Sequence, residues 1–172
     1  MNLVLLRHAT RSGFSLGSGD ELPLNLVGLA QAEDLVTAVN TEHRLPPPTC
    51  LVSSPKLRAR QTLLPLARAC ALELQIMNEL DERRDSETQK AFGQRIRSVI
   101  DLIRSSVKKP RALDETIYVC THLDVLEAAS LLWPTDFSDR EAQASWSTLE
   151  YQIFEWNDDI LYARSRSRIE LR

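Results

Sequence analysis

Short apolar runs recur along the chain and are separated by longer amphipathic segments. Residues 2–6, 50–53 and 116–120 are such runs, dominated by Leu, Val, Ile and Cys. Runs this short, without alternating polar positions, predict strands that are buried on both faces of a sheet. Residues 74–77 form a further candidate strand.

The longer segments have apolar residues at helical spacing. Residues 26–39 carry them every three or four positions, at Leu29, Ala32, Val36 and Val39. This spacing predicts a helix with one buried face, and the same reading predicts helices over residues 88–106 and 123–133. A further helix is predicted to begin with Ser54 as its N-cap and Pro55 as its first helical residue.

The end of the chain has a different pattern. Residues 150–156 and 160–164 are candidate strands on either side of Asn157, Asp158 and Asp159, which are turn residues, so they predict a hairpin. Strands that alternate with helices predict an α/β fold of three layers, α/β/α, with a mostly parallel central sheet. The hairpin adds an antiparallel edge to it. A length of 172 residues favours one domain over residues 1–172.

Composition narrows the class of protein. The 21 Lys and Arg residues against 24 Asp and Glu give a formal net charge of −3, which argues against a dedicated nucleic-acid binder. No apolar run approaches the roughly 18 residues that span a bilayer, and the first residues do not resemble a signal peptide. Cys50, Cys70 and Cys120 lack the spacing of a disulfide framework or a zinc site. We therefore expect a soluble cytoplasmic protein without a membrane or nucleic-acid partner; its oligomeric state stays open.

Polar, basic or imidazole side chains follow three of the predicted strands within a few residues. Arg7 and His8 follow the first, Ser54 and then Arg58 follow the second, and His122 follows the strand at 116–120. Because ligands of open α/β sheets bind beyond the carboxyl ends of the strands, we expect these side chains to meet. Arg guanidinium groups match phosphate oxygens, and Arg58 would lie in the first turn of its helix, where the dipole also favours an anion. The sequence therefore predicts a phosphate site.

Two runs of this site resemble the signatures of the histidine phosphatase (phosphoglycerate mutase-like) superfamily. They are Leu5-Leu6-Arg7-His8-Ala9-Thr10 and Ser53-Ser54-Pro55-Lys56-Leu57-Arg58-Ala59-Arg60-Gln61-Thr62. Residues 24–32 resemble the segment between the two signatures, and residues 120–123 resemble the second histidine motif. Order and spacing agree over residues 2–130.

The resemblance implies roles for individual residues. His8 is expected to be the nucleophile that becomes phosphorylated, Arg7 and Arg58 the phosphate clamps, and His122 the second imidazole that balances the charge of the transferring group. No metal or cofactor is expected, because the arginines neutralise the phosphate. His122 also suits a simple cap on the last helix.

The chain departs from the family pattern at three places. Ala9 stands where the family has a glycine, so we expect crowding there. Leu123 follows His122, where the phosphoesterases have a pair of glycines; this resembles the short bacterial phosphohistidine-phosphatase branch. Leu123 and Ser12 are candidate substrate contacts. Glu82, in Leu80-Asp81-Glu82, matches the spacing of the family's general acid. Yet the long insert that usually follows is missing, and the charged run 79–85 also suits a solvated surface.

The chemistry of the leaving group selects among substrates. Expelling an alkoxide requires a proton donor, whereas imidazole leaves easily because its reference pKa is about 6.5. The preferred hypothesis is thus a phosphatase that acts on phosphohistidine in a phosphorylated protein. The alternatives are a phosphomonoesterase for a small phosphorylated metabolite, with Glu82 as acid, and a non-catalytic module that binds phosphate or a phosphoprotein.

Overall fold

A six-stranded sheet forms the centre of the protein. The computed structural model describes residues 1–13, 22–106, 115–132, 145–157 and 160–169. In spatial order the strands are β3 (Leu74–Ile76), β2 (Cys50–Ser53), β4 (Thr116–Thr121), β1 (Asn2–Arg7), β5 (Glu150–Asn157) and β6 (Ile160–Arg168). The first four are parallel, while β5 and β6 form an antiparallel hairpin beside β1. This confirms the predicted mostly parallel sheet with an antiparallel edge.

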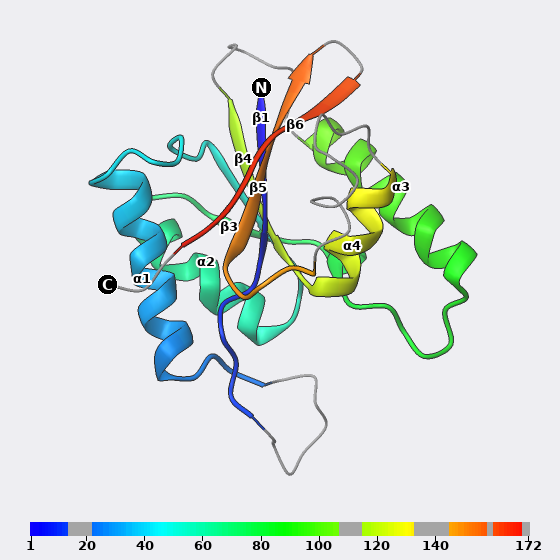
Figure 1. The fold of residues 1–172 in the computed structure, drawn as a ribbon, viewed down its shortest axis with the longest axis horizontal. Helices are drawn as coiled ribbons and strands as arrows, with labels where there is room; N and C mark the ends of the chain where they lie inside the picture. The colour runs from blue at the N-terminus through cyan, green and yellow to red at the C-terminus, as the bar shows by residue number, and fades with distance from the viewer. Residues whose placement is uncertain (14–21, 107–114, 133–144, 158–159, 170–172) are drawn as a thin grey trace.

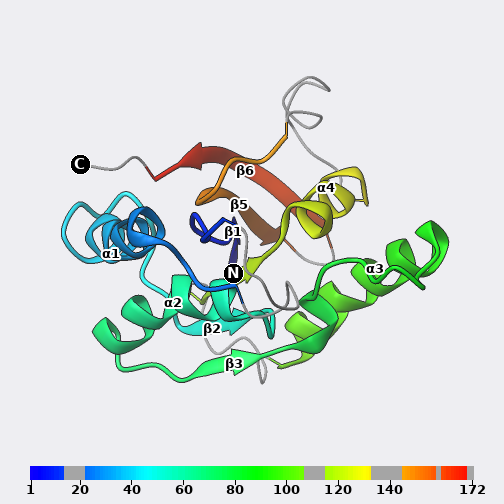
Figure 2. The same ribbon diagram turned by 90° about the horizontal axis from the view of Figure 1, so that it is seen from below.

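Helices cover both faces of the sheet, as the α/β/α prediction requires. In Figure 1, α1 (Leu26–Asn40) and α2 (Leu57–Ala69) lie on one side, and α3 (Gln89–Ser106) and α4 (Leu123–Leu132) lie on the other. Figure 2 shows the same separation from below. A short 3₁₀ helix, η2 (Asn78–Leu80), connects β3 to the segment before α3.

The unbroken apolar run of β1 serves both layers. Val4 and Leu6 pack into the core beneath α1 and α2, and Leu3 and Leu5 pack into the core beneath α3 and α4. Successive side chains of a strand point to opposite faces, so a strand between two helical layers needs apolar residues at every position.

Ser54 does not cap α2, and the prediction for the start of this helix is wrong by two residues. The helix begins at Leu57, and its N-cap Lys56 has extended dihedral angles (φ −63°, ψ 138°) without a side-chain cap. The Ser54 hydroxyl instead lies 2.6 Å from Nε2 of His122. Arg58 remains in the first turn of α2, as expected.

Gly28 allows α1 to lie directly against the loop that follows β1. A Cβ atom at this position would lie 1.9 Å from the carbonyl oxygen of Thr10. Next to this contact, Gln31 Oε1 accepts hydrogen bonds from Thr10 N and Oγ1, at 2.8 and 2.9 Å. The Asn25 side chain caps the helix by accepting from Gly28 N at 2.8 Å. These contacts fix the loop that starts with His8.

The remaining boundaries differ little from the prediction. Strand β6 extends to Arg168, past the predicted end at residue 164. The turn residues Asp158 and Asp159, and the predicted end of the last helix at Trp133, lie outside the described residues.

Candidate active site

His8 follows β1 directly and is almost fully buried. The residue is only 4% exposed, and its backbone N–H donates to the carbonyl of Thr121 at 3.0 Å. Nδ1 lies 2.7 Å from the Ala9 carbonyl oxygen. A carbonyl only accepts hydrogen bonds, so this contact assigns the proton to Nδ1 and leaves the lone pair on Nε2.

The pKa of His8 favours the neutral ring. Burial lowers this pKa to about 4, and the charges of Arg58 and Arg7 add to the effect, while the hydrogen bond to Ala9 opposes it. A neutral imidazole with a free Nε2 has the protonation state of a nucleophile at neutral pH.

His122 faces His8 from the end of the neighbouring strand. The two ring centroids are 5.4 Å apart, with 57° between the ring planes. His122 Nε2 lies 2.6 Å from Ser54 Oγ, and its Nδ1 lies 3.5 Å from Oε1 of Glu82. Burial lowers the pKa of His122 to about 2, assisted by Arg58 and His8. Strands β4 and β1 are parallel neighbours, so their carboxyl ends bring the two histidines together.

Two buried arginines complete the inner site. Arg58 is 2% exposed, and its Nη2 lies 2.6 Å from Glu82 Oε1. Arg7 donates from Nη1 to the Trp146 carbonyl. Burial lowers the pKa of Arg7, and the charge of Glu127 opposes this shift.

The arginines hold donors that the protein does not use. Arg7 Nε, Arg58 Nε and Arg58 Nη1 are buried and have no hydrogen-bond partner among the described residues. Buried unpaired N–H groups are costly, and an anion with several oxygens satisfies them. The arrangement therefore fits a phosphate group.

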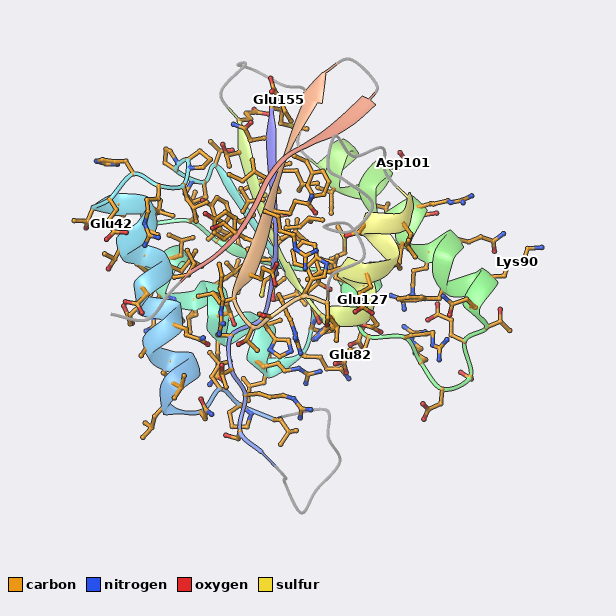
Figure 3. All side chains as sticks on the ribbon, in the orientation of Figure 1. Glu42, Glu82, Lys90, Asp101, Glu127 and Glu155 are labelled. Carbon is orange, nitrogen blue, oxygen red and sulfur yellow. The ribbon has the colours of Figure 1, made fainter. Side chains whose placement is uncertain are left out.

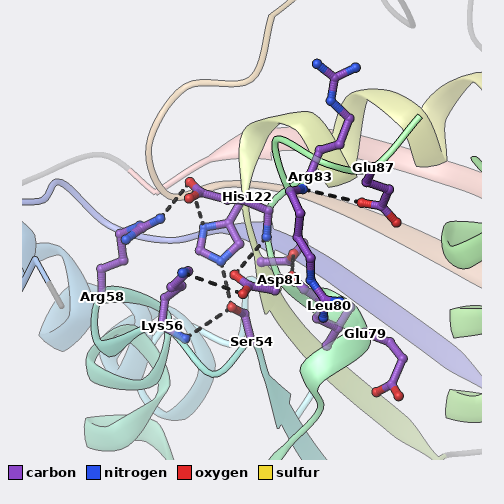
Figure 4. A network of polar contacts seen from close by, with 12 residues as sticks. Ser54, Lys56, Arg58, Glu79, Leu80, Asp81, Arg83, Glu87 and His122 are labelled. Carbon is purple, nitrogen blue, oxygen red and sulfur yellow. Dashed lines mark hydrogen bonds and ion pairs between the residues drawn. The ribbon is translucent and has the colours of Figure 1, made fainter. Parts of the chain in front are cut away.

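Glu82 reaches this site, although it lies in the charged run that also suited a solvated surface. Its side chain is 46% exposed, and its carboxylate contacts Arg58 and His122 from the solvent side of the site. Figure 3 places Glu82 and Glu127 at the edge toward which β1 runs. Figure 4 shows Arg58, His122 and Ser54 directed toward one another there. Beside them, Lys56 Nζ lies 3.5 Å from Asp81 Oδ2.

The alanine after the nucleophile fits its position. Ala9 is fully buried and is not among the residues with positive φ, so the freedom of glycine is not needed. Its N–H donates to Thr62 Oγ1 at 3.0 Å, and the Thr62 hydroxyl donates to the Arg58 carbonyl at 2.8 Å. Thr62 therefore ties the backbone of the nucleophile loop to the helix that carries Arg58.

One family model matches the first part of the chain. The model described as histidine phosphatase superfamily (branch 1) matches residues 3–85, which include both signature runs. Over these residues the chain is similar to the histidine phosphatase superfamily. No curated protein sequence matches it significantly.

Solved structures with the same fold cover nearly the whole chain. A structure assigned as the phosphohistidine phosphatase SixA of Agrobacterium tumefaciens is 18% identical, with a TM-score of 0.68 and 96% of each chain covered. One from Escherichia coli assigned as an α-ribazole-5′-P phosphatase is 20% identical, with a TM-score of 0.74, covering 100% of this chain and 99% of the other. Mycobacterial glucosyl-3-phosphoglycerate phosphatase is 16% identical, with a TM-score of 0.69 and 95% of each chain covered. At such identities the likeness shows the fold.

Two expected contact residues lie apart from the inner site. Leu123 begins α4 and packs against the core beneath α3 and α4. Ser12 donates its N–H to the Pro23 carbonyl at 2.9 Å in the loop before α1. The structure brings together His8, Arg7, Arg58, His122 and Glu82. Leu123 is the chain neighbour of His122, but its side chain packs into the core, and Ser12 is bonded within the loop before α1.

Sequence reasoning missed the supporting roles of two residues. Ser54 holds His122, and Thr62 holds Ala9. Thr62 stands one helical turn after Arg58 within the signature run, and that spacing was its only signal. Within the described part of the chain, no group of three or more His, Cys, Asp or Glu side chains is placed to hold a metal. None of the described helices has the length and hydropathy needed to cross a membrane.

Proposed function

We propose that this protein is a phosphatase that works through a phosphorylated His8. Nε2 of His8 attacks the phosphorus atom, and the bond from phosphorus to the leaving group breaks. Water then attacks the phosphorus atom of the phosphohistidine, the phosphorus–nitrogen bond breaks, and phosphate and His8 are released. The observation that carries the proposal is the 2.7 Å contact between His8 Nδ1 and the Ala9 carbonyl, which leaves Nε2 free to attack.

The neighbouring groups suit the charge changes of this reaction. Phosphoryl transfer depends on positioning and on stabilising the charge of the equatorial oxygens. Arg7 and Arg58 supply buried N–H donors for these oxygens. His122 offers Nδ1 to the same group from a ring held by Ser54. Two guanidinium groups neutralise the phosphoryl group, so the proposed reaction requires no cofactor.

Phosphohistidine on a protein is the proposed substrate. An imidazole leaving group needs little help from an acid, and the long insert that follows the acid segment in the phosphoesterases is missing here. SixA of Agrobacterium tumefaciens, which shares this fold, is assigned as a phosphohistidine phosphatase. The free Cys50, Cys70 and Cys120 fit a reducing compartment such as the cytoplasm.

A small phosphate ester is the second candidate, and the position of Glu82 favours it. Its carboxyl oxygen lies 2.6 Å from Arg58 Nη2 and 3.5 Å from His122 Nδ1, on a side chain that is 46% exposed, so a leaving group that departs toward solvent could pass it. A carboxyl group there, once protonated, can supply the proton that an alkoxide requires.

The test compares wild type, His8→Ala and Glu82→Gln on a phosphohistidine protein, glycerol phosphate and nitrophenyl phosphate. His43→Asn, at an exposed loop histidine with φ 51°, is the matched control. We expect His8→Ala to abolish turnover of every substrate and His43→Asn to leave it unchanged.

The substrate that wild type prefers decides between the two candidates. Glu82→Gln should spare phosphohistidine and nitrophenyl phosphate but slow glycerol phosphate about 10²-fold or more if Glu82 is the acid. Tungstate binding without turnover of any substrate would contradict the enzyme proposal and favour a phosphate-binding module.

A further inference from the structure

Arg95, on α3, reaches the backbone of the segment that carries Glu82. Its Nη1 donates to the carbonyls of Glu79 and Asp81, at 2.5 and 2.9 Å, and its Nη2 donates to the carbonyl of Glu82 at 3.3 Å. Three carbonyls within four residues thus converge on one guanidinium group. The planar fork of arginine is suited to such multiple contacts, and lysine is not.

Glu87 fixes Arg95 in this position. The carboxylate accepts from Nε at 2.8 Å and from Nη2 at 2.7 Å, and both side chains are largely buried, at 13% and 14% exposed. The hydrogen bonds lower the pKa of Glu87 and raise the pKa of Arg95. Arg95 also lies over the ring of Phe92, with its guanidinium carbon 5.0 Å from the centroid. The guanidinium group is therefore held from its own helix as well as from the segment.

The segment is anchored from the sheet and α4 too. Thr121 Oγ1 donates to the Leu80 carbonyl at 2.7 Å, and Asp124 Oδ2 accepts from Arg83 N at 2.6 Å. Figure 4 shows Glu79, Leu80, Asp81 and Arg83 passing beside His122. The backbone around Glu82 is thus bound on both sides, whereas the Glu82 carboxylate itself is 46% exposed. Its direction toward the site therefore depends on the backbone that carries it as well as on its ion pair with Arg58.

We propose that Arg95 is a positioning residue that holds Glu82 against Arg58 and His122. The inference rests on the proposed phosphatase function and concerns Glu82, the acid of its second candidate, the hydrolysis of a phosphate ester. Without the guanidinium group, the three carbonyls lose their shared donor, the segment relaxes, and the Glu82 carboxylate leaves the site. Loss of Arg95 should therefore reproduce loss of the Glu82 carboxylate, although Arg95 itself contacts no substrate.

The variants are Arg95→Met, Arg95→Lys, Glu82→Gln and the double variant Glu82→Gln/Arg95→Met. Arg97→Met is the matched control, because Arg97 is exposed on the same helix and makes no hydrogen bond or ion pair with the rest of the described chain. The first measurement is kcat/KM on glycerol phosphate and on nitrophenyl phosphate. We expect Arg95→Met to slow the alkyl ester about 10²-fold and the activated ester less than about threefold, with no further loss in the double variant. Arg95→Lys restores little, because lysine lacks the fork.

The second measurement does not depend on turnover. The Glu82 carboxylate stands beside Arg58, so it repels a tungstate dianion, and its removal should tighten tungstate binding about tenfold. Arg95→Met should tighten binding to the same extent as Glu82→Gln, as measured by titration calorimetry. Equal losses on both esters, or tungstate affinity that stays at the wild-type value in Arg95→Met, would overturn the proposal.

The two proposals fail differently. A wild type that hydrolyses neither ester nor phosphohistidine contradicts the proposed function, and the tungstate comparison still decides the role of Arg95. Should Arg95→Met not fold, Glu87→Gln removes the anchor of the guanidinium group instead and carries the same expectations.

Discussion

Substituting alanine for Gly28 would insert a methyl group where α1 touches the loop after β1. The added Cβ would lie 1.9 Å from the Thr10 carbonyl oxygen, 2.9 Å from its carbon and 3.1 Å from its nitrogen. All three atoms belong to the backbone, so no side-chain rotation relieves the clash. Helix and loop must separate.

The size of the separation follows from the contact distance. Cβ atoms essentially never approach other atoms below 3.0 Å, so the 1.9 Å contact requires a shift of about 1.1 Å. Inserting a methyl group into a well-packed contact costs about 1–3 kcal/mol. The shift also weakens the hydrogen bond from Asn25 N to Thr10 O, 3.1 Å long, and those from Thr10 to Gln31. We expect the free energy of unfolding to fall by about 3 kcal/mol. Thr10 is two residues from His8, and a misplacement of about 1 Å can cost about 10²-fold in rate.

Gly93 is the matched control for this substitution. It lies in α3, and a Cβ atom there would meet nothing within 4 Å. Helix propensity favours alanine over glycine by about 1 kcal/mol in both helices, so Gly93→Ala should stabilise the protein. Urea unfolding and kcat/KM on nitrophenyl phosphate measure both variants. The reasoning is refuted if Gly28→Ala unfolds at the same urea concentration as Gly93→Ala or retains wild-type activity.

Three further predictions concern the inner site. The pKa of His8 is lowered from 6.5 to about 4, so kcat/KM should fall only below about pH 4. The free energy of unfolding should also decrease as the pH falls from 6.5 to 4, by on the order of 3 kcal/mol, because the unfolded chain binds a proton that native His8 does not. Urea titrations from pH 4 to 8 measure this slope, which His8→Gln should reduce. Ser54→Ala leaves the buried Nε2 of His122 without its partner and should lower the free energy of unfolding in urea by about 1–3 kcal/mol. The control Ser98→Ala, on the surface of α3, should lower it by less than about 0.5 kcal/mol. Thr62→Val removes the acceptor of Ala9 N–H and should lower the free energy of unfolding by about as much as Ser54→Ala, with a lowered kcat. Thr37→Val should be nearly neutral, because the Thr37 hydroxyl makes only a long 3.4 Å bond to Glu33 O. Equal losses of stability in the two threonine variants would contradict the role of Thr62.

The layers of the fold were predictable because the central strands β1 and β4 are apolar runs that are buried on both faces of the sheet. Strand β4 is buried at all six positions, and its sequence is an apolar run with threonine at each end. The bounds of helix α1 were predicted to within one residue. Its buried face was predicted only in part, because Ala32 and Val39 are buried while Leu29 is 44% exposed. The start of α2 was not predictable from capping preferences alone, because the Ser54 hydroxyl that suits a cap is bound to His122 from a distant strand. A local preference lost to a tertiary contact.

The inner site was predictable for a topological reason. His8 and His122 follow two parallel neighbouring strands, so the sheet itself brings them together whatever the loops do. Glu82 depends on more than topology. Its segment follows a strand of only three residues and a single turn of 3₁₀ helix, which leaves its direction undetermined by the sequence pattern. Its backbone is held by tertiary contacts, among them the guanidinium group of Arg95, thirteen residues later on α3. On the sequence, Arg95 is one of several charged positions in an amphipathic helix, and nothing in its spacing distinguishes it from the exposed Arg97. Side chains that bind backbone carbonyls of another segment leave no periodic signal, so the residues that orient an active-site loop are the last to be found from sequence.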